Sequence, residues 1–212
     1  MEEFISQHRA IVGAKAVEAL IKKGYLAEFL PDETMAKERL IELIPDRASV
    51  GFGGSMTVRR LDVKGELEKK GCLLYDHNAE KDPVKAEEAR RKQLSCDVFL
   101  TSSNAITMDG RLYNVDGRGN RVAAMIFGPG EVIVVAGVNK IVPDLDAAEE
   151  RVKSYAAPMN NLRLHTENPC VKTGRCMDCS ATGGICNITT ILNRCPNGAK
   201  IRALIVGEAL GF

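Results

Sequence analysis

Five of the seven cysteines of this chain lie in one short stretch near its carboxyl end, at Cys170, Cys176, Cys179, Cys186 and Cys195. A C-x2-C step such as Cys176–Cys179 places two thiols on one tight turn, and further cysteines on either side can complete a tetrahedral zinc site or hold an iron–sulfur cluster. We therefore predict that Cys170, Cys176, Cys179 and Cys186 are metal ligands for zinc or an iron–sulfur cluster. Cys195 is an alternative to Cys170.

The same cysteines have a second interpretation, as inert or redox-labile thiols. Their spacing matches no standard ferredoxin pattern, and five candidates exceed the four ligands that a site needs. His165 is an alternate ligand, whereas Cys72 and Cys96 lie in or beside apolar runs and are expected to be packing residues. The chain begins Met1-Glu2-Glu3 without a secretory signal, so we expect a cytoplasmic protein in which stable disulfides do not form.

A glycine-rich loop follows an apolar run and precedes a helical pattern, with Gly51, Gly53, Gly54, Ser55 and Thr57 in it. At this point of a parallel α/β protein, glycines let an anion approach the backbone, and the next helix offers free N–H groups. The loop is neither a P-loop nor a G-x-G-x-x-G motif. We predict that it binds substrate, and the alternative is a structural turn with Ser55 as the helix N-cap.

Two further clusters of polar residues follow apolar strands. Their candidate substrate-binding residues are Ser103, Asn104, Asp109, Asn120 and Asn139. Because the carboxyl ends of parallel strands meet at one edge of a sheet, we expect these clusters to share a pocket with the glycine loop. The same residue types also form ordinary surface turns.

The elements that must position these residues alternate along the chain. Apolar runs predict strands from residue 48 and over residues 72–75, 98–101, 132–136 and 201–206; periodicity and capping signals predict helices over 4–21, 32–44, 58–70, 84–94, 121–127 and 144–155. Asp109-Gly110 predicts a hairpin turn. Continuously apolar strands separated by amphipathic helices indicate an α/β fold with a mostly parallel sheet and helices on both faces.

Composition restricts the class of protein. The 212 residues, 45% hydrophobic, suit one domain over residues 1–212, within which residues 168–196 form a cysteine-rich excursion before the last strand. A net charge of +1 without basic blocks argues against nucleic-acid binding. No apolar stretch approaches the roughly 20 residues that span a bilayer.

Four segments resemble the LUD (lactate utilisation) domain family, in the order in which that family shows them: residues 51–57, 102–107, 114–121 and 134–142. The match spans roughly residues 5–151, and the cysteine segment with residues 207–211 resembles one branch of the family. The resemblance implies a Rossmann-like open sheet similar to the NagB, ribose phosphate isomerase and CoA transferase superfamily, with its active site at the glycine loop and adjacent strand ends. Family members are linked to oxidation of lactate to pyruvate alongside iron–sulfur partners.

Compared with the isomerase relatives, Asp109 or Asp116 resembles their acidic residue in an Asp-Gly context. No counterpart of the transferase nucleophilic glutamate stands out, since Glu131 and Glu208 lie in unmatched contexts. We therefore assign the catalytic acid/base work to Asp116, with Lys140 as its electrostatic partner.

Two hypotheses about function follow. The first is an enzyme or redox-enzyme subunit that acts on a small carboxylate or phosphorylated metabolite, in lactate utilisation and with an iron–sulfur redox partner protein. The second is a noncatalytic metabolite or redox sensor, or an assembly subunit, with structural zinc. A homo-oligomer is compatible with either.

Overall fold

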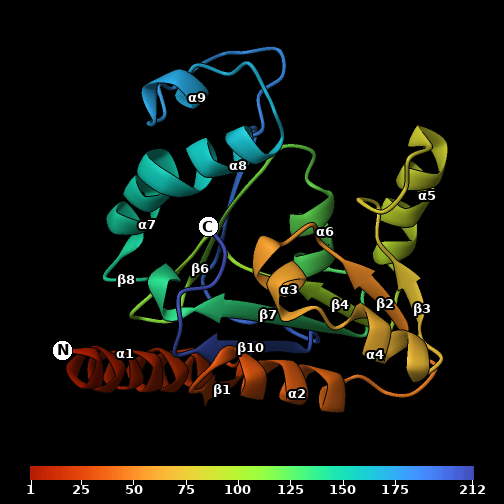
Figure 1. Cartoon of the computed structure of the whole chain (residues 1–212), viewed down its shortest axis with the longest axis horizontal. Coiled ribbons are helices and arrows are strands. Elements are labelled where there is room, and N and C mark those ends of the chain that lie inside the picture. Colours follow the sequence, from red (N-terminus) through yellow and green to blue (C-terminus); the bar gives the residue numbers. More distant parts are fainter.

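The computed structural model describes residues 1–212 and is built around a sheet of six parallel strands (Figure 1). In spatial order the strands are β1 (Leu26–Leu30), β10 (Ile201–Val206), β7 (Glu131–Gly137), β4 (Val98–Thr101), β2 (Ser49–Phe52) and β3 (Leu73–Tyr75). The last strand, β10, lies between β1 and β7, so the chain returns to the middle of the sheet after the cysteine segment. The predicted α/β class and parallel sheet are confirmed.

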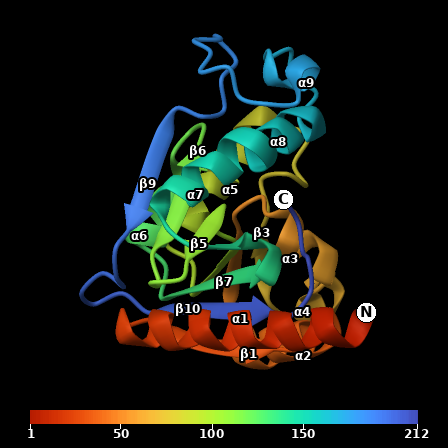
Figure 2. The ribbon, with the colours of Figure 1, turned by 90° about the vertical axis from the view of Figure 1, so that its left-hand side faces the viewer.

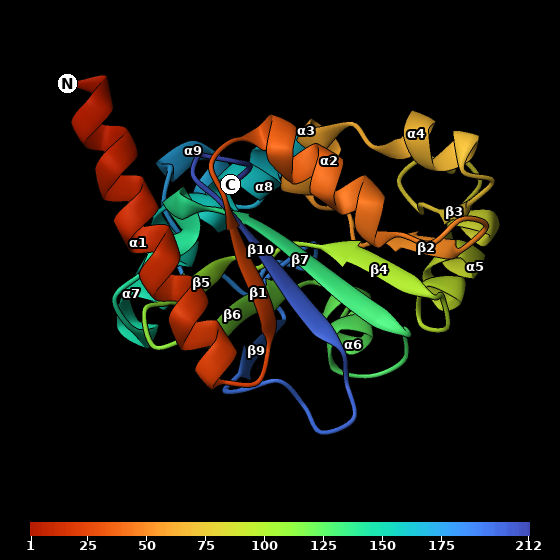
Figure 3. The same cartoon turned by 90° about the horizontal axis from the view of Figure 1, so that it is seen from below.

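Successive side chains of the strands enter two separate cores, as expected for a sheet covered on both faces. Leu100 packs in the first core and Phe99 in the second. The first core is covered by α2 (Glu33–Leu43), α3 (Met56–Leu61) and α4 (Lys64–Lys69). On the opposite face lie α1 (Glu2–Lys22), α5 (Pro83–Gln93) and α6 (Asn120–Ile126); Figure 3 shows α1 and α2 on either side of β1.

A second, four-stranded sheet adds to that opposite face and was not predicted. Its order is β8 (Ile141–Val142), β5 (Ala105–Thr107), β6 (Leu112–Asp116) and β9 (Ile188–Leu192). The β5–β6 pair is the expected antiparallel hairpin around Asp109-Gly110. Figure 2 shows how α7 (Leu145–Arg151), a π-helical turn (Val152–Ala156) and α8 (Ala157–Arg163) cross over this sheet.

Two local features of the fold differ from what the sequence predicted. The strand Leu26–Leu30 follows directly on the first helix and was not predicted, because Glu28 interrupts its apolar run. The helix expected over residues 58–70 is two helices, since Asp62 at the end of α3 has a left-handed backbone (φ 46°) that breaks the helical path. By contrast, Asp32 caps α2 as expected, accepting a hydrogen bond from Met35 N at 2.8 Å.

None of the helices is both long and apolar enough to cross a bilayer.

Candidate active site at the strand ends

A pocket of about 310 Å³ opens at the carboxyl ends of β2, β4 and β6. It is formed by the β2–α3 loop, the residues after β4, the β6–α6 turn, a short 3-10 turn (η1, Val138–Lys140), α8 and the end of the cysteine segment. The site residues named from the sequence that line it are Gly53, Gly54, Ser55, Ser103, Asn104, Asp116, Asn120 and Lys140. Polar residues from three separate stretches of sequence therefore share one cavity.

The glycine loop places backbone, with little side chain, against this cavity. Gly54 has φ +74°, a conformation that side-chain-bearing residues rarely adopt. A Cβ on Gly53 would lie 2.9 Å from the ring of Phe99, so this glycine is required by packing. Ser55 caps α3 by accepting a hydrogen bond from Val58 N at 3.3 Å, and it also lines the pocket. The capping and ligand-loop interpretations of this residue are thus compatible.

Lys140 is a buried cation at the back of the pocket. It is 4% exposed, and its Nζ donates to Thr57 Oγ1 at 2.9 Å and to Ser102 Oγ at 3.0 Å. It forms no salt bridge with any carboxylate. Burial, and then the nearby charges of Arg151 and Arg121, lower the pKa of Lys140 to about 7. The amino group can therefore exchange a proton near neutral pH, and when it is charged it has no counter-ion.

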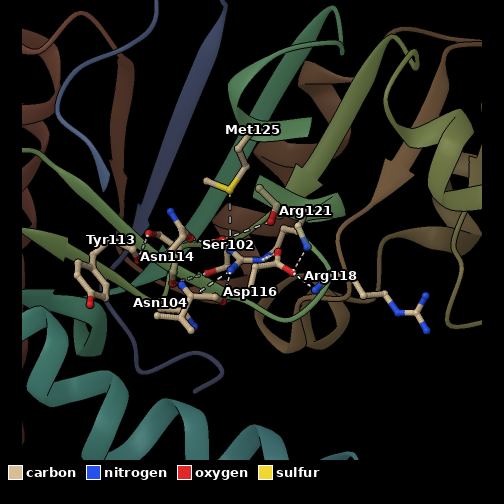
Figure 4. A network of polar contacts seen from close by, with 12 residues as sticks. Ser102, Asn104, Tyr113, Asn114, Asp116, Arg118, Arg121 and Met125 are labelled. Carbon is tan, nitrogen blue, oxygen red and sulfur yellow. Dashed lines mark hydrogen bonds and ion pairs between the residues drawn. The ribbon is translucent and has the colours of Figure 1, made fainter. Parts of the chain in front are cut away.

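Arg121 connects the strand ends beside Lys140 through one network of hydrogen bonds, drawn in Figure 4. Its guanidinium donates to the Oδ1 atoms of Asn114 at 2.6 Å and Asn104 at 3.1 Å, and to two backbone carbonyls, of Val115 at 2.8 Å and Ser102 at 3.1 Å. Planar guanidinium donors suit such a fixed fan of acceptors. Arg121 thus holds the β4 end, β6 and α6 in one arrangement.

Asp116 presents two different oxygens to its surroundings. Oδ1 accepts from the backbone N–H groups of Arg118 at 3.1 Å and Gly119 at 2.9 Å. Oδ2 is buried without a hydrogen-bond donor, and its nearest cation is Arg121 Nε at 3.5 Å. A carboxylate fixed by one oxygen and free at the other is suited to accept a proton from a ligand.

The pocket carries a strong excess of positive charge. Its lining includes five basic side chains and a single acidic one, Asp116. The basic residues are Arg90, Arg118, Arg121, Lys140 and Arg163. Arg90 Nε is buried without a hydrogen-bond partner, and Nη1 of the same guanidinium pairs with Glu87 at 3.4 Å. This electrostatic environment favours an anion.

Four residues named from the sequence do not line the pocket. Asp109 lies in the β5–β6 turn, where it accepts hydrogen bonds from Thr107 and Arg111, and this turn packs against the backbone of α1. Asn139 Oδ1 accepts from Leu210 N at 3.1 Å and so holds the carboxyl-terminal residues. Gly51 lies within β2, and Thr57 contributes indirectly by holding Lys140.

The sequence interpretation also missed most of the pocket's cations. Arg90 comes from α5, Arg163 comes from α8 and Arg118 comes from the β6–α6 turn, and no local motif marks the first two. His77 and Asn78, which follow β3, also line the cavity. Burial, followed by the charge of Arg90, lowers the pKa of His77. Their position after a strand is the one signal that pointed toward them.

The five cysteines near the carboxyl end lie in two different parts of the molecule. The Cys186 residue is exposed, but its thiol is partly enclosed; this enclosure and the charges of Cys176, Cys170 and Cys179 raise its pKa to about 11. Burial and the charges of Cys179 and Cys176 likewise raise the pKa of Cys170. Figure 1 shows the segment that carries these four cysteines beyond α8. As they are placed, no group of three or more His, Cys, Asp or Glu side chains could hold a metal ion.

Cys195 belongs to another part of the molecule. Its backbone N–H donates to Lys23 O at 3.0 Å, and its thiol contacts Ala199 O at 3.5 Å. It also lies close enough to Tyr25 to help raise the pKa of that phenol, after burial. Cys195 is thus no substitute for Cys170 in this arrangement.

Comparisons with known proteins bear on the family and the fold. The LUD domain model matches residues 13–206. A crystal structure of a DUF162 family protein from Deinococcus radiodurans covers 93% of this chain and 98% of its own, with a TM-score of 0.55 and 14% identity, a likeness of fold. A structure of a D-ribose-5-phosphate isomerase in complex with phospho-erythronic acid covers 52% of this chain and 53% of its own, with a TM-score of 0.36 and 19% identity. A search among curated proteins gave no match.

Proposed function

This chain belongs to the LUD domain family, and we propose that it is an enzyme that binds a small carboxylate or phosphorylated metabolite in the strand-end pocket and transfers a proton on it. The observation that carries the proposal is Lys140, a buried amino group that is held by two hydroxyl groups and has no carboxylate partner. An unpaired buried charge is costly, and an anionic ligand would neutralise it.

The surrounding residues support the anion over a neutral ligand. Arg90 and Arg163 line the same cavity, and Arg90 Nε has no partner within the protein. The volume of about 310 Å³ lies at the lower end of small-molecule sites. Lactate, which the family's name suggests, is one candidate of the right charge and size.

The proposed chemistry is general acid/base catalysis at a carbon next to a carbonyl or carboxylate. Asp116 Oδ2 accepts a proton from that carbon, and the Lys140 ammonium stabilises the negative charge that develops on the adjacent oxygen. Return of the proton to the same or the neighbouring carbon completes the reaction without any net oxidation. Asp116 Oδ1 stays bound to the β6–α6 turn throughout.

Calorimetry with L-lactate, pyruvate, inorganic phosphate and a small phosphorylated sugar tests the binding step. We expect at least one of them to bind, and Arg90→Gln to weaken that binding by about tenfold, since a hydrogen bond to a charged group contributes about 1.5–3 kcal/mol. The control is Arg91→Gln, because Arg91 is the next residue of α5 and its side chain is 77% exposed. Equal losses in both variants, or no binding by the parent, would refute the anion pocket.

Solvent-deuterium incorporation, followed by NMR, tests the chemical step. The bound metabolite should exchange a carbon-bound proton with solvent, and Asp116→Asn should abolish that exchange while leaving binding within a few-fold. The amide keeps the Oδ1 acceptor that fixes the turn, so this variant isolates the proton acceptor. Binding without any exchange would favour the noncatalytic sensor.

A further inference from the structure

His77 is a half-buried residue of the anion pocket to which the proposed reaction gives no role. It follows β3, and its ring lies against the glycine loop, where a Cβ on Gly54 would be 3.7 Å from Nε2 and 3.8 Å from Cε1. The one hydrogen bond of the ring within the protein is made at Nδ1. The ring therefore keeps Nε2 free, at the loop that borders the cavity.

The other ring nitrogen, Nδ1, lies 3.1 Å from the side-chain nitrogen Nε2 of Gln93, the last residue of α5. Gln93 is 1% exposed, and the same amide nitrogen donates to Tyr75 O at 2.9 Å and to Phe52 O at 3.0 Å. Carbonyl oxygens only accept hydrogen bonds, so an amide turned the other way would place its own oxygen against both of them. The ends of β2 and β3 thus determine the orientation of this amide.

That orientation determines the tautomer of His77. The amide nitrogen of Gln93 offers two hydrogens to three acceptors and cannot accept a hydrogen bond itself. Nδ1 of the ring faces this donor and consequently carries no hydrogen. A neutral imidazole without a hydrogen at Nδ1 carries it at Nε2, the nitrogen that lies at the glycine loop.

The charges around the ring favour its neutral form. Arg90 of α5 and Arg118 of the β6–α6 turn act on it from two elements, and Asp76 precedes it in the chain. Burial, and then the charge of Arg90, lowers the pKa of His77. The ring is thus a neutral donor in the range above pH 7, where Lys140, with its pKa of about 7, becomes a neutral amine.

We propose that His77 donates a hydrogen bond from Nε2 to an oxygen of the anion bound in the pocket, and that Gln93 is the positioning residue that holds this tautomer. The anion is the ligand of the proposed function, on which this contact rests, whereas the tautomer is a property of the protein alone. The ligand then needs an acceptor oxygen at the glycine loop as well as one near Lys140. Carboxylates and phosphates have two or more such oxygens.

Nitrogen-15 NMR of the unaltered chain above pH 7 tests the tautomer. The chain has three histidines, so comparison with His77→Phe assigns the signals of this ring. We expect the chemical shift of an unprotonated nitrogen at Nδ1 and of a protonated one at Nε2, and a mixture of tautomers in Gln93→Met. Gln7→Met, at an exposed position of α1, is the control and should leave the signals unchanged. A parent that carries its hydrogen at Nδ1 overturns the proposal.

Calorimetry with inorganic sulfate at pH 7 and pH 8 tests the contact. His77→Phe should weaken binding by about tenfold at both pH values, because a neutral donor does not titrate in this range. His77→Gln should stay within about threefold of the parent, since its side-chain N–H can replace the donor. The control is His8→Phe, because His8 is exposed on α1.

Two results would overturn the contact and leave the anion pocket in place. The first is sulfate binding that His77→Phe does not change, and the second is a loss that shrinks between pH 7 and pH 8, as an imidazolium would give. A parent that binds no anion refutes the proposed function and this contact together, whichever tautomer the NMR spectrum shows.

Discussion

The anion pocket and the cysteine segment are held in place by different means. Arg121 makes four strong hydrogen bonds to the elements around it, and Lys140 makes two. The residues Cys179 and Cys186 are exposed and lie in a stretch without regular structure. Sites supported by regular elements are held more precisely than sites on loops. The comparison indicates that the pocket is formed before its ligand arrives, whereas the stretch from residue 177 to residue 186 has no comparable network to hold it.

The two regions also differ in charge. Basic residues surround the pocket with one carboxylate among them, so an anion is the charge that the pocket lacks. In the cysteine segment, burial and then the neighbouring cysteines raise the pKa of Cys170 and Cys186, so these thiols favour their neutral form. Ile185 and Asn187 bring the two regions into contact.

The largest effect that distinguishes the two regions is expected from Arg121→Met. This change leaves the acceptors of Asn104 and Asn114 buried without their donor and removes the cation next to Asp116. Loss of one member of a buried charged network costs about 3–5 kcal/mol. Chemical denaturation, monitored by circular dichroism, should show that decrease in the free energy of unfolding.

Cys179→Ser is the comparison for that variant. Cys179 is exposed and makes no hydrogen bond, so the free energy of unfolding should stay within about 0.5 kcal/mol of the parent. If both substitutions destabilise the protein equally, the distinction between a preorganised pocket and a loosely held segment is lost.

A smaller effect, on affinity rather than stability, is expected from the titration of Lys140. Its pKa is lowered to about 7, so the side chain is an ammonium below that pH and a neutral amine above it. Anion affinity should therefore be high below pH 7 and fall by up to about tenfold per pH unit above it, by proton linkage. Inorganic sulfate is the probe, because its charge is constant between pH 6 and pH 9.

Lys140→Met should weaken sulfate binding at pH 6 and remove this pH dependence. Lys15→Met, on the exposed face of α1, is the control and should keep the parent profile. His77 also lines the cavity, but burial lowers its pKa, so its titration lies on the acid side of its ordinary value. A profile that still falls through pH 7 in Lys140→Met would assign the titration to another group.

The sequence predicted those parts of the site that are local in the chain. Ser55 and Asp116 follow apolar strands with turn residues around them, and both line the pocket. Arg90 and Arg163 were missed, because they lie on α5 and α8 and reach the cavity only through tertiary packing. Asp109 shows the opposite error, since an equally suggestive Asp-Gly pair proved to be the hairpin turn against α1.

The fold, like the site, was predictable where the signal is local in the chain. Apolar runs identified five strands of the central sheet, β2, β3, β4, β7 and β10. The strands that were missed include β1 of this sheet and β9 of the second sheet, which carry exposed or partly exposed residues at most positions. The position of Cys195 also depended on packing, because its backbone bond to Lys23 closes a link of more than 170 residues. Spacing alone left Cys170 and Cys195 equivalent, and the tertiary structure separates them.

The smallest effect is expected from Gly54→Ala in the glycine loop. Alanine at φ +74° costs about 1–2 kcal/mol in backbone conformation, and the loop can relax part of that strain by turning away from the pocket. Its Cβ would also approach Asn78 Nδ2 to 3.2 Å, at the cavity wall. We expect a loss of anion affinity of a few-fold by calorimetry. Gly65→Ala is the matched control, because a Cβ there meets no atom within 4 Å and its φ is not positive. Unchanged affinity in a folded Gly54→Ala protein would mean that the loop lies beside the ligand without contacting it, and that the basic side chains alone make the anion site.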